Sequence, residues 1–69
     1  MKYLIMLYAT YNTEVPTKKG MYEAETEADA IASFHGYMST YMKDATVAHV
    51  LVHIVDTEGN VIRSESFTR

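Results

Sequence analysis

The stretch VAHVLVHIVD, residues 47–56, decides the fold because its length suits either a helix or a strand. On a helix, His49 and His53 would lie about one turn apart and could bind one zinc ion. The valines and the isoleucine instead favour a pleated strand. Four residues of a strand span roughly 13 Å, which is too far for two imidazoles to share a zinc ion about 2 Å from each. We therefore expect a strand here, and no helical histidine–zinc pair.

Alternation along this strand separates two faces. An aliphatic set, expected to pack beneath a helix, comprises Ala48, Val50, Val52 and Ile54. A mixed set, expected to be partly exposed, comprises Val47, His49, Leu51, His53 and Val55.

The segment before this strand predicts a hairpin. KYLIMLYATYN (2–12) is rich in aromatic and aliphatic residues and is typical of a strand. Both of its alternating faces are apolar, which indicates a central strand covered on both sides. A loop at 12–20, which contains Pro16, connects it to a short strand at 21–26.

A helix is predicted from Thr26 to about Lys43. Thr26 and Asp29 form a loose capping box, and Glu27 and Asp29 suit the positive end of the helix dipole. At 100° per residue, the expected buried stripe consists of Ile31, Phe34, His35, Met38, Tyr41 and Met42.

The segment VIRSESFT (61–68) follows the turn DTEGN (56–60) and is expected to pair with the strand 47–56. Its alternation places on one face Val61, Arg63, Glu65 and Phe67. The predicted fold class is therefore α+β, with the order ββαββ: a four-stranded, mainly antiparallel sheet with one helix packed on one face. The 69 residues form a single domain, 1–69.

One helix covers only one face of a sheet, so we expect the other face to be apolar and uncovered, as is typical of an interaction surface. The loop 12–20 folding across this face, or strong coiling of the sheet, is the alternative. Because both faces of the first strand are apolar, the pattern does not decide which one meets the helix. To the uncovered face we assign Tyr3, Ile5, Leu7, His49, Leu51, His53, Arg63 and Phe67.

Composition favours self-association. The chain has no cysteine, which excludes disulfides and thiolate metal sites, and self-association is a common source of stability for so short a domain. Six tyrosines and five methionines are residue types enriched at interfaces. We expect a homodimer in which Tyr and Leu supply buried area and Arg63 and the histidines orient the contact. Alternatively, His49 and His53 form a metal site across the dimer, a pH-sensitive interface, or ordinary partly buried strand residues.

The net charge of −3 disfavours direct nucleic-acid binding, because tyrosines on an open sheet need a basic surround to bind phosphate. The acidic residues suggest a different possibility, an inhibitor of a nucleic-acid enzyme that acts through a charged surface. This acidic surface would consist of Glu23, Glu25, Glu27 and Asp29.

No enzyme and no cofactor are expected. The sequence contains no nucleophile motif and no glycine-rich phosphate loop. The clustered carboxylates fall at a strand end and a helix start, which does not predict a catalytic cleft. The apolar run YLIMLYA is too short for a bilayer span, and no signal-peptide features follow it, so we expect a cytoplasmic protein without a membrane partner.

Three segments resemble small single-domain proteins of bacteriophages and prophages: KYLIMLYATYN, EADAIASFHGYMSTYMKD and VLVHIVDTEGNVIRSES. The shared features are a first strand that ends in tyrosine, a helix with A-x-x-x-F-H, and a last hairpin that turns at E-G-N. The resemblance implies a phage accessory role in the host cytoplasm. Such proteins include minor virion components and inhibitors of host defences, among them anti-CRISPR proteins, and a host or phage protein would then be the partner.

Overall fold

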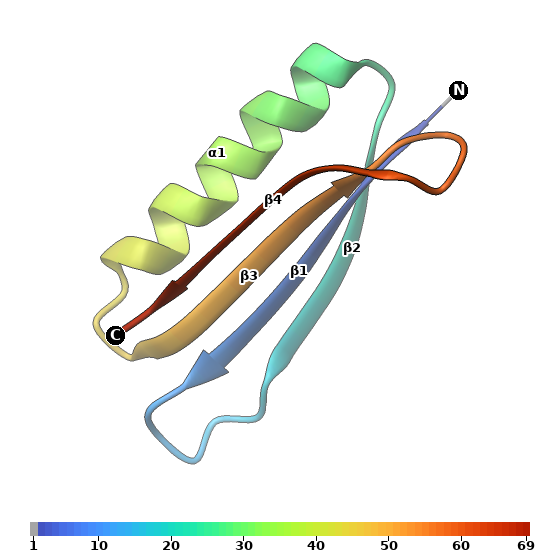
Figure 1. The fold of residues 1–69 in the computed structure, drawn as a ribbon. Helices are drawn as coiled ribbons and strands as arrows, with labels where there is room; N and C mark the ends of the chain where they lie inside the picture. The colour runs from blue at the N-terminus through green and yellow to red at the C-terminus, as the bar shows by residue number, and fades with distance from the viewer. Residues whose placement is uncertain (1) are drawn as a thin grey trace.

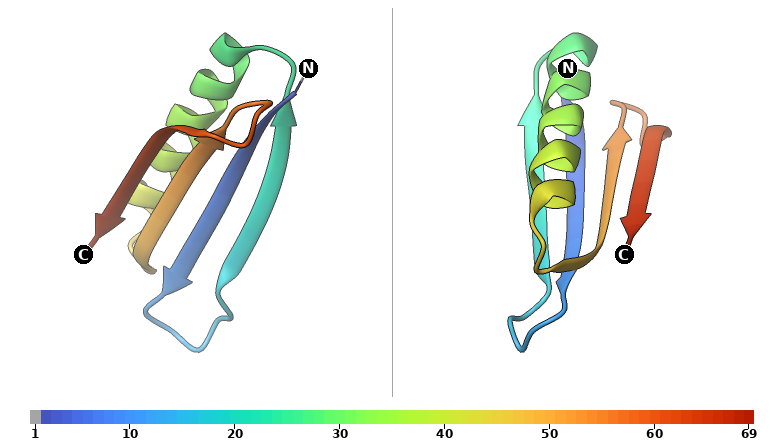
Figure 2. Two further views of the ribbon diagram at one scale, coloured as in Figure 1. Left: turned by 45° about the vertical axis from the view of Figure 1, so that its right-hand side comes forward. Right: turned by 90° about the vertical axis from the view of Figure 1, so that its left-hand side faces the viewer.

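A computed structural model describes residues 2–69, which form one four-stranded sheet and one helix. The elements follow in the order β1 (Tyr3–Tyr11), β2 (Lys18–Ala24), α1 (Glu27–Lys43), β3 (Val47–Val55) and β4 (Val61–Thr68). The strands lie side by side in the order β2-β1-β3-β4, and all neighbours are antiparallel. Figures 1 and 2 show α1 against one face of the sheet. The predicted ββαββ α+β fold is confirmed.

The helix begins and ends where the sequence predicts. Thr26 is the N-cap, and its hydroxyl accepts a hydrogen bond of 3.1 Å from the Asp29 amide. Glu27 and Asp29 occupy the first turn, near the positive end of the helix dipole. At the other end, the Asp44 amide donates to the Tyr41 carbonyl.

The buried face of α1 differs in part from the expected stripe. Ala30, Phe34 and Met38 are buried, at a spacing of four residues. His35, which was expected in the stripe, is exposed, and Met42 is 39% exposed. The stripe of α1 that is buried against the sheet is therefore narrower than the helical periodicity predicted. On either side of it the helix carries partly buried residues, namely Ile31, Tyr37 and Tyr41.

The face of β1 that meets the helix is the one assigned by sequence to the open side. Ile5 is opposite Ile54 and Leu7 is opposite Val52, so their side chains share the helix-covered face with the aliphatic set of β3. Ile5 is 1% exposed and Leu7 is 3% exposed. The assignment of Tyr3, Ile5 and Leu7 to the open face is therefore wrong, because the register with β3 turns the odd-numbered residues of β1 toward α1.

The same correction applies to β4. Arg63 is opposite Ile54 and Phe67 is opposite Val50, so both lie on the helix side of the sheet. The guanidinium of Arg63 lies 5.9 Å from the centre of the Phe34 ring. Arg63 and Phe67 therefore do not belong to the open face.

Two irregularities in register place single residues outside the simple alternation. Between Thr10 and Tyr11 the pairing shifts, so Tyr11 is opposite Val47, and Val47 is fully buried instead of partly exposed. A second shift pairs Val61 with Val55, which separates Val61 from the face that it was expected to share with Arg63.

β2 is longer than predicted and begins at Lys18, within the segment expected to be a loop. Figure 1 shows the remaining connection between β1 and β2 extending from the end of the sheet, not across the open side. Gly20 allows the Tyr22 ring to lie close to the backbone, since an added Cβ would be 2.8 Å from ring atoms of Tyr22. The Tyr22 ring stacks on Tyr37 with centroids 4.8 Å apart, and burial raises the pKa of Tyr37.

Candidate functional site

The surface most suited to binding is the side of the sheet opposite α1, here called the open face. Its residues lie in rows across the sheet that follow from the strand register. One row, the Met21 row, consists of Met21, Met6, His53 and Ser64. The two neighbouring rows consist of Lys19, Tyr8, Leu51 and Ser66, and of Glu23, Leu4, Val55 and Val61. The last row consists of Thr10, His49 and Thr68.

The middle of the open face is apolar and exposed. Met21 is 62% exposed, Tyr8 41% and Met6 39%, and these three residues neighbour one another on β1 and β2. Together with Leu51 and His53 they line a shallow depression of about 550 Å³. Figure 2, left, shows this side of the sheet with α1 behind it. A contiguous exposed apolar surface on a small domain is typical of an interaction site.

The two strand histidines have different surroundings. His49 Nδ1 lies 2.7 Å from the Thr68 hydroxyl, which connects β3 to β4. His53 lines the depression, and its Nδ1 is buried without a hydrogen-bond partner among residues 2–69. Because the segment is a strand, the two rings are not arranged as a helical zinc pair. Within residues 2–69, no group of three or more potential metal ligands comes together.

The structure divides the predicted interface residues between the two faces. His49, Leu51 and His53 lie on the open face as expected. The remaining five lie on the helix side: Tyr3, Ile5, Leu7, Arg63 and Phe67.

Three prominent members of the open face were missed, namely Met6, Tyr8 and Met21. Met6 and Tyr8 alternate with Ile5 and Leu7 in the sequence, and Met21 lies opposite Met6 on β2. The signal was ambiguous because both sets are apolar, and only pairing with the unambiguous strand β3 distinguishes them.

The acidic residues do not form one uniform surface. Lys2 Nζ lies 2.8 Å from Glu23 and 3.8 Å from Glu25, and the hydrogen bond with Glu23 raises the pKa of Lys2. Glu27 and Asp29 lie in the first turn of α1, where they interact with the helix dipole. A basic partner at this end of the molecule would therefore meet two carboxylates that already share a lysine.

No helix within residues 2–69 has the length and apolar character needed to cross a membrane. No family model, no curated protein and no solved structure matches the sequence. The geometry of the open face is accordingly the main basis for a functional proposal.

Proposed function

We propose that the chain is a non-enzymatic protein-interaction module that forms a homodimer through the open face. The observation that carries this proposal is the exposed apolar depression formed by Met6, Tyr8, Met21 and Leu51. Methionine and tyrosine are enriched in the buried centres of interfaces.

A second copy fits the area that the open face offers. Four strands about 4.8 Å apart and about eight residues long give roughly 500 Å² of flat surface, before the relief of the side chains is counted. The smallest specific interfaces bury about 600 Å² on each partner. The open face can bury that much area only if a partner covers most of it. An identical sheet face has the dimensions to cover it completely.

The charges at the margin of the face are compatible with two-fold symmetry. Lys19 and Glu23 lie two residues on either side of Met21, on the same strand. Consider a two-fold axis that lies between the two sheets and runs parallel to the Met21 row. This axis places β2 of one copy over β2 of the second copy, with the two strands running in opposite directions. Each Lys19 then faces Glu23 of the second copy, and the pairing favours this orientation of the dimer over others.

The biological setting that we propose is that of a phage accessory protein, which rests on the resemblance of the three segments described above. A minor virion component and an inhibitor of a host defence nuclease remain the alternatives. The inhibitor would act through the acidic residues. The ion pairs that Lys2 makes with Glu23 and Glu25 leave that surface less charged than the sequence suggested.

The test is the solution mass of open-face variants, measured by size exclusion with light scattering over a range of concentrations. We expect Met21→Lys to halve the mass of the wild-type assembly, because it places a lysine in the apolar centre of the open face of each copy. Leu51→Lys should have the same effect. Met21 is 62% exposed, so its substitution leaves the core of the monomer unchanged.

The matched control is Val15→Lys, which introduces the same charge at an apolar residue that is 55% exposed in the loop between β1 and β2. We expect it to leave the mass unchanged. If Met21→Lys and Leu51→Lys retain wild-type mass and wild-type circular dichroism, the open face is not the dimer interface and the proposal is wrong.

A further inference from the structure

We infer that β4 is a second self-association surface, whose free edge pairs with β4 of another copy in antiparallel register centred on Ser64. This edge is distinct from the open face, and the inference does not depend on the function proposed above. The partner is a second copy of the same chain, and the contact consists of backbone hydrogen bonds and two ion pairs.

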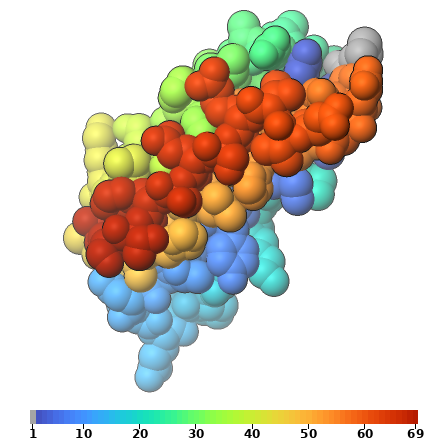
Figure 3. Space-filling model, viewed as in Figure 1, coloured from blue at the N-terminus to red at the C-terminus, as the bar shows by residue number. Residues whose placement is uncertain are grey.

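The outer edge of β4 is exposed along its whole length. β4 is the last strand of the sheet and pairs only with β3. Figure 3 shows its residues as an uninterrupted orange-to-red band across the front of the molecule, and Figure 2, right, shows β4 at the margin of the sheet beyond α1. An exposed strand edge presents unpaired N–H and C=O groups to other chains.

The two edges of the sheet differ in their protection. Proteins commonly block edge pairing with lysine, proline or bulges. The edge strand β2 carries Lys18 and Lys19. The eight residues of β4 include neither lysine nor proline, and the register with β3 is regular from Arg63 to Thr68. The bulge opposite Ile54 and Val55 protects only the start of β4, so self-pairing is opposed along β2 and is unopposed from Arg63 to Thr68.

The direction of the free backbone groups follows from one hydrogen bond. The Arg69 amide donates to the Ala48 carbonyl at 2.9 Å, so residue 69 points its backbone groups toward β3. Along an antiparallel strand this direction alternates. Arg63, Glu65 and Phe67 therefore direct their groups toward β3, whereas Ser64 and Ser66 direct theirs outward.

A register centred on Ser64 uses these outward groups. Ser64 of each copy exchanges both backbone hydrogen bonds with Ser64 of the other. Arg63 then lies opposite Glu65 of the second copy, as a pair that is not hydrogen-bonded through the backbone, and such pairs have the shorter Cα separation of about 4.5 Å. By symmetry the ion pair occurs twice, and neither Arg63 nor Glu65 is ion-paired among residues 2–69.

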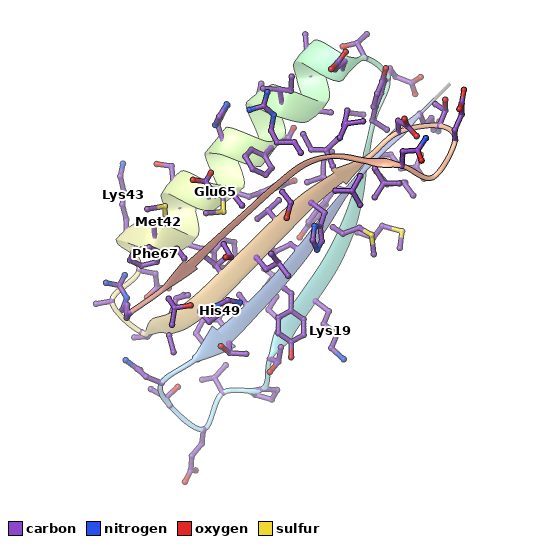
Figure 4. The ribbon with its side chains drawn as sticks, in the orientation of Figure 1. Lys19, Met42, Lys43, His49, Glu65 and Phe67 are labelled. Carbon is purple, nitrogen blue, oxygen red and sulfur yellow. The ribbon has the colours of Figure 1, made fainter. Side chains whose placement is uncertain are left out.

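Neighbouring registers place like charges together. In a register centred on Arg63, the Arg63 side chains of the two copies lie opposite one another. In a register centred on Glu65, the two Glu65 side chains do so. Like charges directly opposite across strands are destabilising. A centre on Ser66 sets Arg63 against Arg69. The Ser64 register keeps the paired segment, Arg63 to Glu65 of each copy, within the regular part of β4 that follows the bulge. Figure 4 labels Glu65 and Phe67 along β4.

The edge contact is compatible with the open-face dimer. The two-fold axis of the edge pair passes beside Ser64, and Ser64 is the last residue of the Met21 row. The two proposed axes therefore meet, and both contacts together close into a tetramer with three two-fold axes instead of an open fibre.

Charge reversal in a Met21→Lys background tests the edge separately from the open face. We expect Met21→Lys to remain a dimer through β4. Arg63→Glu or Glu65→Arg in addition should raise its dissociation constant about tenfold or more, because both ion pairs become repulsive. The double reversal Arg63→Glu with Glu65→Arg restores opposite charges and should restore the dimer. Lys43→Glu, on the exposed end of α1, is the control for the change in net charge and should have no effect.

Amide hydrogen exchange supplies the second readout. In an unpaired chain, the amides of Ser64 and Ser66 should exchange fast and those of Arg63 and Glu65 slowly. In the edge dimer the Ser64 amide should become protected as well. A Met21→Lys variant that is folded and monomeric at every concentration overturns the inference, as does an edge dimer whose mass is unaffected by the single charge reversals. The open-face proposal fails by a different result, an unchanged mass on Met21→Lys.

Discussion

The guanidinium of Arg69 donates a hydrogen bond of 2.6 Å to the carbonyl oxygen of Met42 in the last turn of α1. The same group donates to the carbonyls of Asp44 and Val47, each at 2.8 Å. The last carbonyls of a helix have no partner within the helix, and a charged donor satisfies them well. Arg69 thereby connects the residue after β4 to the end of the helix and the start of β3.

Arg69→Ala should lower the free energy of unfolding by about 1–3 kcal/mol, because hydrogen bonds from a charged donor are lost to three carbonyls. Arg69→Lys should give an intermediate loss, since an ammonium group cannot reproduce the planar fork of the guanidinium. Urea unfolding followed by circular dichroism measures both. The control is Lys43→Ala in the same region, and an equal loss for Lys43→Ala and Arg69→Ala would contradict the role assigned to Arg69.

The corrected face of β1 can be tested with one pair of substitutions. Ile5 is 1% exposed and Ile62 is 41% exposed. Ile5→Val should cost about 0.5–1.5 kcal/mol, because it removes a buried methylene from the core. The same change at Ile62 should stay within about 0.5 kcal/mol of wild type. Equal effects at the two positions, measured in a monomeric variant, would mean that the odd-numbered face of β1 does not meet the helix.

Gly20→Ala should destabilise the chain by about 1 kcal/mol or more, through a forced movement of Tyr22. The added Cβ would lie 2.8 Å from the ring, which must then leave its stack on Tyr37. Thermal unfolding gives the stability, and near-ultraviolet circular dichroism reports the tyrosine environment. The control is Gly36→Ala, where no atom lies within 4 Å of the added Cβ and the helix propensity improves. An unaltered tyrosine signal in Gly20→Ala would contradict the close approach.

The turn between β3 and β4 should make stability depend on pH in the acid range. An oxygen of Asp56 accepts from the amides of Glu58 and Asn60, each at 2.9 Å, and the backbone hydrogen bond from Asn60 is the main cause that lowers the pKa of Asp56. Because the pKa of Asp56 is lower in the folded chain than its ordinary value of 3.8, the ionised carboxylate stabilises the fold at pH values above 3.8. This stabilisation is lost as the pH falls through the pKa of Asp56 in the folded chain.

The measurement is the melting temperature from neutral pH to about pH 2, compared between wild type and Asp56→Asn. Asparagine keeps an acceptor oxygen but does not titrate, so the variant should lose less stability below pH 4 than the wild type does. Glu14→Gln, in the exposed loop before β2, is the control and should follow the wild-type curve. Identical pH profiles for wild type and Asp56→Asn would exclude Asp56 from the acid transition.

Local patterns predicted the elements well. The cap at Thr26, the turn at Gly59 and the β-branched run at 47–55 each place an element through short-range chemistry, and all are found where expected. The bounds of β2 were misjudged, since it begins at Lys18 instead of residue 21 and ends at Ala24 instead of residue 26. The start was missed because Lys18, Lys19 and Gly20 have low strand propensity. Pairing with seven consecutive residues of β1 overrides that preference.

The candidate site was predicted only in part, because it depends on pairing between distant segments. His49, Leu51 and His53 were placed correctly, since β3 has one aliphatic face and one mixed face. Met6 and Tyr8 could not be separated from Ile5 and Leu7, because each set buries apolar area equally well beneath a helix. The two bulges add residues that no period of two describes, and the one between Thr10 and Tyr11 places Val47 in the core.

The sequence by itself determined the order of elements, the antiparallel class of the sheet and the existence of one uncovered apolar face, because hydrophobic periodicity and capping act within a few residues. The tertiary structure alone decided which face of β1 is uncovered, where the depression lies and which strand edge is free. Those properties follow from the register between β1 and β3, and a shift of one residue would have turned every side chain of β1 to the opposite face.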